Sequence, residues 1–354
     1  MMPNKFQLIQ ALKAIVAVLI LVGHLGAVAA EKLNYTFLPS GIVRTGGVDF
    51  FFVLSGFLIY FLYFKNINKG KVSLFLKKRA VRIYPILWIF TLISLPVYFF
   101  VASFGGGHET QPGVIIKSLL LYPQSKPVLG ATWSLSHVIL FYGLFALFLH
   151  NPRLTRRIAL GWSILITYLW IWPPSLTLPY EIQFLFSPFN LEFLLGCVVA
   201  HFALKLKLKY EVFMIAAGVS LFPLAWINNI NGYVPVNTTI MYSVASALII
   251  LGALSLDSKR TVTIHKWVDK LGDSSYAIII TNLPMIIFIT KIFDVLNLHG
   301  TIGYVPAILL TGVLTAIGGM LVHMFIEQPV TKYLSSKFIV KKQKVTVVPA
   351  KQTA

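Results

Sequence analysis

The fold of this chain follows from the stretch FQLIQALKAIVAVLILVGHLGAVAA, residues Phe6–Ala30. The stretch is long enough to cross a membrane as one helix, yet it contains two ionisable side chains, Lys13 and His24. They are eleven residues apart, so one helix places them on the same face, about 16 Å apart along its axis. A charged side chain deep in a membrane helix costs about 2.5 to 3.5 kcal/mol. The pair therefore indicates a polar cavity inside a helical bundle.

The composition is that of a membrane protein with several spans. Of 354 residues, 57% are hydrophobic and 12% are charged, whereas soluble domains contain about 25% charged residues. The net charge of +19 would suggest nucleic acid as the partner of a soluble protein, but basic loops on one side of a membrane explain it without nucleic acid. Cys197 is the only cysteine, which excludes an intrachain disulfide and a cysteine metal cluster.

The apolar runs predict an all-α integral membrane protein, a bundle of about ten transmembrane helices. Pro85 falls near the start of one predicted helix, where proline is tolerated, whereas Pro96, Pro223 and Pro284 fall inside spans and predict kinks. The predicted spans are 7–30, 46–64, 84–104, 131–149, 157–173, 187–205, 210–228, 237–256, 274–296 and 303–326.

The distribution of basic residues predicts how the protein is oriented in the membrane. Most of the 30 Lys and Arg residues fall in alternate loops, which assigns those loops and both termini to the cytoplasm of a multi-pass plasma-membrane protein. Residues 1–334 are predicted to form the transmembrane domain, and residues 335–354 a basic, disordered cytoplasmic tail. The basic residues outside this pattern are Lys32, Arg44, Lys117, Lys126 and Lys291, with Lys13 inside the first span.

The first span has an alternative interpretation as a cleaved signal peptide. Lys5 and Lys13 would form its basic region, Ala14 to Gly26 its apolar region, and Ala27 to Ala29 its cleavage motif. This interpretation would discard the polar residues that the span contains.

One candidate site lies in the outer half of the predicted membrane. His24 and Asp49 fall at comparable depth on the first two helices, and a carboxylate beside an imidazole can orient a general base. The alternative is that His24 bonds a backbone carbonyl and Asp49 is an interfacial residue at a helix start.

A second candidate site lies at the cytoplasmic start of the third span. Arg79 and Arg82 are three residues apart, so a helix presents both on one face, where their guanidinium groups could clamp phosphates. The alternative is ordinary positive charge on the cytoplasmic side of the membrane.

Seven short motifs follow one another in order along nearly the whole chain. The first is a basic residue followed after ten residues by histidine, Lys13 to His24. The others are GVDFFFVLSGFLI (Gly47–Ile59), RAVRIYP (Arg79–Pro85), TWSLSHVILFY (Thr132–Tyr142), NLEFLLG (Asn190–Gly196), LGDSSYAIIITNLP (Leu271–Pro284) and FIEQP (Phe325–Pro329). Together they resemble the motifs of the membrane-bound acyltransferase 3 family, especially its exopolysaccharide O-acetyltransferase branch.

The resemblance implies transfer of an acyl group, usually acetyl, from cytoplasmic acyl-CoA to a hydroxyl of a cell-envelope, exported or lipid-linked saccharide. His24 would be the general base, Asp49 would orient it with Glu192 as second candidate, and Lys13 would replace the family's arginine. No permanently bound cofactor and no metal are expected, because a thioester is already activated. Arg79 and Arg82 would bind the CoA phosphates, and Trp133, Ser134, Ser55 and Asn282 would line the cavity.

The chain departs from the family pattern at three positions. Lys13 loses the planar fork of arginine, Val138 stands where relatives have glutamate, and Asn282 where they commonly have histidine. These departures leave open a catalytically silent relative of the acyltransferases.

A function of another class is a carrier or flippase for a glycolipid or small polar solute. Ionisable residues inside the membrane also suit a translocation path. His201 and His323 have no partner recognisable from the sequence, and one interpretation of Glu327 with Pro329 is a cap at the end of the last helix.

Overall fold

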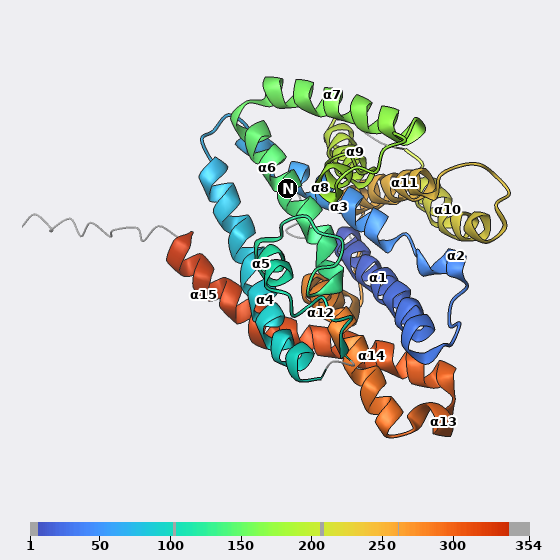
Figure 1. The fold of residues 1–354 in the computed structure, drawn as a ribbon. Coiled ribbons are helices and arrows are strands. Elements are labelled where there is room, and N and C mark those ends of the chain that lie inside the picture. Colours follow the sequence, from blue (N-terminus) through green and yellow to red (C-terminus); the bar gives the residue numbers. More distant parts are fainter. Residues whose placement is uncertain (1–5, 102–103, 206–208, 261, 340–354) are drawn as a thin grey trace, which may run out of the picture.

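The computed structural model describes residues 6–101, 104–205, 209–260 and 262–339, and in these ranges the chain forms helices and no strand (Figure 1). The first half contains α1 (Gln7–Leu33), α2 (Ser40–Val43), α3 (Gly47–Tyr63), α4 (Val72–Phe100), α5 (Pro112–Leu120), α6 (Trp133–His150) and α7 (Pro152–Ile171). The second half contains α8 (Tyr180–Leu185), α9 (Phe189–Ala203), α10 (Glu211–Asn231), α11 (Thr238–Lys259), α12 (Lys266–Val295), α13 (Leu298–Ile302), α14 (Tyr304–Val322) and α15 (Gln328–Phe338). Two 3-10 turns, Phe64–Asn66 and Gly130–Thr132, precede α4 and α6, and a π-helical segment, His323–Glu327, joins α14 to α15.

Helix α1 lies at the centre of the bundle and packs mainly against α12, with further contacts to α3, α11 and α14. Lys13 and His24 lie on this single helix, as the sequence predicts. Two of the backbone N–H groups at its start, those of Leu8 and Ile9, donate to the Asp257 carboxylate at 2.8 and 3.4 Å. An anion there satisfies N–H groups that have no partner within the helix and interacts favourably with the helix dipole.

The segment considered as a signal-peptide cleavage motif lies inside α1. Val28 and Ala29 are buried, and they pack in an apolar cluster with residues of α12 and α14. The structure therefore uses this segment as part of the packed bundle.

Helices α3 and α9 are in direct backbone contact through two glycines. A Cβ atom at Gly56 would lie 2.1 Å from the Phe193 carbonyl oxygen, and one at Gly196 would lie 2.1 Å from that of Val53. Only glycine allows this approach, which fixes the position of the α9 residues Asn190 and Glu192 relative to α3.

Nine of the described helical segments are long and apolar enough to cross a membrane. The other predicted span, 157–173, is present as α7, whose first turns contain three arginines and which falls outside that set. Two contacts nevertheless show that α6 and α9 run in the same direction. Trp133 meets Phe189 at the starts of the two helices, and Phe141 meets Phe193 further along both of them.

A return helix is therefore needed between α6 and α9. Helix α7 has 20 residues and a length of about 30 Å, enough to carry the chain back across the bundle. It lies at the edge of the bundle in Figure 1 and contains two buried residues, Thr155 and Ile166.

Helix ends differ from the prediction at several places, and α12, for example, begins at Lys266 rather than near residue 274. Helix α4 begins at Val72 rather than near residue 84, so Pro85 lies in its interior. The basic and polar residues before Pro85 extend the helix beyond its apolar part, where periodicity alone does not mark an end. The interpretation of Glu327 and Pro329 as a cap at the end of the last helix is also wrong, because the chain continues through the π-helical segment into α15.

Helix α15 also overlaps the predicted tail. It runs to Phe338, so residues 335–338 are helical, while residues 340–354 lie outside the described part of the chain.

Candidate active site

Two adjoining cavities open between α1, α4, α12 and the C-terminal helices. The first cavity, here called the basic vestibule, has a volume of about 630 Å³ and is lined by residues from α1, α4, α12 and α15. The second, here called the inner cavity, has a volume of about 360 Å³ and lies between α1, α3, α4, α6 and α12. Lys13, Arg79 and Arg82 line both cavities, so the two spaces meet at these three cations.

The vestibule is mainly basic. Its cationic side chains are Lys13, Lys78, Arg79, Arg82 and Lys332, and its acidic side chains are Asp273 and Glu327. Because Ser335 and Lys13 line the same space, the start of α1 and the end of the described chain lie at the same face of the bundle. Figure 1 shows α15 beside α4 at this face.

Arg79 is held in place by aromatic side chains. One of its terminal nitrogens donates to the Tyr63 hydroxyl at 3.0 Å, and its guanidinium lies 5.1 to 5.7 Å from the ring centres of Tyr63, Tyr142 and Phe75. Such cation–π contacts fix the plane of the guanidinium. Arg82, one turn further along α4, is exposed. The predicted pair therefore shares a face of α4, with Arg79 packed among aromatic rings and Arg82 exposed.

Lys13 belongs to a polar chain between α1 and α12. Its Nζ donates to Gln10 Oε1 at 2.9 Å, and Gln10 Nε2 donates to Asp273 Oδ1 at 2.6 Å. Gln10 Nε2 also donates to the Asp269 carbonyl at 3.0 Å. This chain stabilises a cation at the junction of the two cavities.

The π-helical segment places a histidine and a carboxylate in the vestibule. His323 Nδ1 lies 2.7 Å from Glu327 Oε2. The partner of His323 was missed from the sequence, although the spacing of four residues is one at which helical side chains meet. His201 also has a partner, the Tyr60 hydroxyl of α3 at 2.7 Å from its Nδ1, and this contact between two helices has no signal in the local sequence.

The inner cavity has mostly apolar walls, and apart from the three cations its polar lining residues are uncharged. Ser55 and Ser275 line it, and so does Val138, the residue that stands where relatives have glutamate. Its walls reach Val16 on α1 and Ile279 on α12. Along these helices, His24 is about 12 Å beyond Val16, and Asn282 is about one turn beyond Ile279.

His24 is bonded to Asn282, with Nδ1 and Oδ1 2.6 Å apart. An amide oxygen can only accept, so His24 Nδ1 carries the proton and donates, which leaves Nε2 as the basic nitrogen. Asn282 is fully buried, and its Nδ2 has no hydrogen-bond partner among the described residues. The pair thus combines a base in a fixed tautomer with a free donor.

The prediction that Asp49 orients His24 does not match this geometry. Asp49 is buried and pairs with Arg44 at 2.6 Å, and Arg44 also donates to the Thr239 hydroxyl at 2.7 Å. Arg44 was expected to be a loop residue, although its position just before the helix that contains Asp49 favours such a pair.

Glu192 lies beside the same pair rather than beside His24. It accepts a hydrogen bond of 3.0 Å from the Ser243 hydroxyl. Asp49, Glu192 and Arg44 therefore form a polar cluster between α3, α9 and α11, and a catalytic role for either carboxylate remains a prediction.

Trp133 and Ser134 begin α6 and line neither cavity. Trp133 packs against Phe189 with ring centres 5.3 Å apart, and the buried Ser134 hydroxyl donates to the Ala131 carbonyl at 3.0 Å. In the part of the chain that the structure describes, no group of three or more His, Cys, Asp or Glu side chains has the arrangement of a metal site.

Comparison with known proteins agrees with this architecture. The chain is 26% identical over 322 residues to the exopolysaccharide production protein ExoZ of Rhizobium meliloti (strain 1021), which covers 86% of this chain and 93% of that protein. No solved structure matches the chain. The family model described as an acyltransferase domain, acyltransferase 3, matches residues 7–324. Its match includes the His24–Asn282 pair and every residue that lines the inner cavity except Phe6, while the α15 residues of the vestibule lie beyond it. The chain belongs to this acyltransferase family.

Proposed function

We propose that this protein is an acyl-CoA-dependent O-acetyltransferase that modifies a cell-envelope or exported polysaccharide. The observation that carries the proposal is that Lys13, Arg79 and Arg82 line both the basic vestibule and the inner cavity. One ligand can therefore place an anionic part among the cations and a narrow, uncharged part between the helices. Acyl-CoA has this division, with a nucleotide that carries phosphates and a long arm that ends in a thioester.

The vestibule suits the nucleotide part of the donor. Arg79 has a fixed guanidinium plane and Arg82 is exposed, so together they can form charge-assisted hydrogen bonds to phosphate oxygens. Lys78 and Lys332 add positive charge around them. The vestibule is proposed to face the cytoplasm, where acyl-CoA is available, and this agrees with the orientation that the basic loops predict.

The inner cavity suits the arm and the acyl group. Its apolar walls run between the helices toward the level of Ile279, one turn from Asn282. An arm that extends past Val138 would bring its thioester toward His24. Val138 therefore lies on the proposed path of the donor.

The proposed reaction needs one base and no metal. His24 Nε2 takes the proton of the acceptor hydroxyl while the hydroxyl oxygen attacks the thioester carbonyl carbon. The carbon–sulfur bond then breaks, the ester is formed, and the imidazolium returns the proton to the departing thiolate. General-base catalysis of this kind contributes about 10² to 10⁴ in rate.

Asn282 has two proposed tasks in this reaction. Its Oδ1 holds His24 in the tautomer with a basic Nε2, and its unpaired Nδ2 can donate to the oxygen that becomes negative during the attack. The similarity to an exopolysaccharide production protein supports a saccharide hydroxyl as the acceptor. The acceptor is proposed to approach from the face opposite the vestibule.

The test measures transfer of labelled acetyl from acetyl-CoA into envelope polysaccharide, with membranes that contain equal amounts of each variant. We expect label with the wild type and with the control H150A, an exposed histidine at the end of α6, and loss of label with H24A. Equal transfer by H24A and wild type would exclude His24 as the base. Label with V138E alone would identify a silent copy, and saccharide movement without any acyl donor would identify a carrier.

A further inference from the structure

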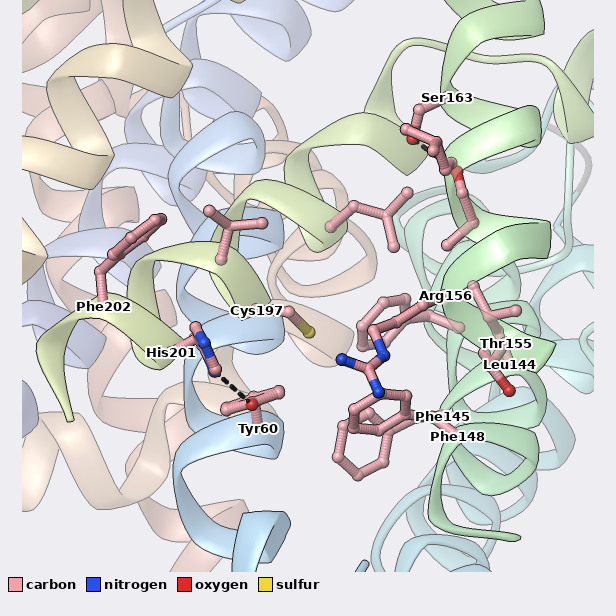
Figure 2. A pocket seen from close by; sticks show the side chains of 15 residues that line it. Tyr60, Leu144, Phe145, Phe148, Thr155, Arg156, Ser163, Cys197, His201 and Phe202 are labelled. Atoms are coloured by element: carbon pink, nitrogen blue, oxygen red, sulfur yellow. Dashed lines mark hydrogen bonds between the residues drawn. The ribbon is translucent and has the colours of Figure 1, made fainter. Parts of the chain in front are cut away.

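A third cavity lies away from the proposed donor path, between α3, α6, α7 and α9. Its volume is about 410 Å³, and its walls are mainly apolar, with Phe145, Phe148, Leu160 and Val198 among the lining residues. Figure 2 shows the Arg156 side chain reaching from α7 toward Tyr60, His201 and Cys197 across this space.

One end of this cavity is polar and positively charged. Arg156 and Lys205 both act electrostatically on His201, and Arg156 also acts on Tyr60. His201 and Tyr60 are bonded to each other at 2.7 Å. Arg156 Nε donates to the Pro152 carbonyl at 3.1 Å, which leaves its terminal nitrogens available to an anion in the cavity.

The other end of the cavity is apolar and open at its side. From Arg156 to Ser163 the cavity follows α7 for about two turns, or roughly 10 Å. Leu160 and Val198 line it and are 64% and 48% exposed, so they lie at the perimeter of the bundle. In a membrane, a lipid can therefore reach the cavity sideways.

Helix α7 touches the rest of the bundle only weakly in this region. Its two buried residues are Thr155, which lines one end of the cavity, and Ile166, which lies beyond the other end. Trp162 Nε1 donates to the Leu185 carbonyl at 2.9 Å, which adds one polar link to the chain before α9. The gap between α7 and its neighbours thus has a cation at one end and an apolar interior.

We propose that this cavity binds one anionic phospholipid, with its phosphate against Arg156 and an acyl chain between α6, α7 and α9. The positive end favours a lipid of net negative charge, because the ammonium group of a zwitterionic lipid would meet Arg156 and Lys205. The bound lipid completes the packing of α7. This site does not depend on the proposed transferase reaction.

The first test uses the purified full-length protein in detergent and measures thermal unfolding with added phosphatidylglycerol or phosphatidylcholine. We expect phosphatidylglycerol to raise the unfolding temperature more than phosphatidylcholine does, and R156Q to weaken the apparent affinity for phosphatidylglycerol about tenfold. The control R157Q removes an exposed charge of α7 that does not line the cavity, and should bind as the wild type does. Equal effects of the two lipids, or equal losses in R156Q and R157Q, would overturn the proposal.

The second test locates the acyl chain with a phosphatidylglycerol that contains a photoreactive diazirine in that chain. Crosslinks should concentrate on the lining segments of α6, α7 and α9, and L160W should reduce them by filling the cavity. L165W, an exposed α7 residue outside the cavity, is the matched control. Crosslinks spread evenly around the apolar perimeter, or unchanged by L160W, would show that the cavity holds no specific lipid.

Discussion

His24 and Asn282, 258 positions apart in the sequence, are joined by a contact of 2.6 Å between Nδ1 and Oδ1. This bond connects α1 to α12, the two helices at the centre of the bundle. It fixes the protonation pattern of the imidazole, because the amide oxygen can only accept. Asn282 is therefore a positioning residue for the proposed base, in the place where Asp49 was expected.

Replacement of Asn282 should slow transfer without removing the base. N282A should lower kcat roughly ten- to hundredfold, because a hydrogen bond to a group that becomes charged contributes about 1.5 to 3 kcal/mol. In N282D the carboxylate favours the protonated imidazole, so the acid limb of the pH–rate profile should move to higher pH. The measurements are kcat and its pH dependence in membranes.

The neighbouring residue provides the control for this prediction. Thr281 is fully buried, and its hydroxyl bonds the Ala277 carbonyl within α12, away from His24. T281V should keep the wild-type pH profile. A profile unchanged in N282D, or shifted equally in T281V, would contradict the positioning role.

Loss of Arg82 should weaken donor binding more than it slows the chemical step. R82Q should raise the KM for acetyl-CoA about tenfold and reduce the salt dependence of this constant, because a phosphate contact is lost. K77Q removes a neighbouring exposed charge of α4 that lines neither cavity, and its KM should stay near that of the wild type. Equal KM values for R82Q and K77Q would remove Arg82 from the donor site.

The contact of α3 with α9 should be intolerant of a single methyl group. In G196A the new Cβ would meet the Val53 carbonyl oxygen, so the helices must separate, at a cost of about 1 to 3 kcal/mol. In G143A on α6, the new Cβ has nothing within 4 Å, and the higher helix propensity of alanine should stabilise the protein by up to about 1 kcal/mol. Thermal unfolding in detergent compares the two, and a loss in G143A as large as that in G196A would exclude the helix contact as the cause.

Helix α7 should cross the membrane although its first turns contain arginines. In a C197A background, which has no cysteine, S175C follows α7 and K69C lies in the predicted cytoplasmic loop after α3. A membrane-impermeant maleimide should label S175C in intact cells and K69C only after permeabilisation. Labelling of both positions, or of neither, in intact cells would contradict the crossing.

The sequence by itself determined the class of the protein and most of its helices. Long apolar runs and a helical period are local properties, and they predicted that Lys13 and His24 share one helix and that Arg79 and Arg82 share one face. The motifs were sufficient to recognise the acyltransferase family before any contact between helices was known.

Only the tertiary structure decided which polar groups meet. Asp49 pairs with Arg44, and His24 with Asn282, because the close approach of α3 to α9 and the packing of α1 on α12 set the depth and rotation of each helix. The meeting of the two cavities at three cations from two helices has the same origin. The hydrophobic pattern shows which face of a helix is buried but not which neighbour it meets, and partner choice depends on side-chain shape and backbone approach across the whole bundle.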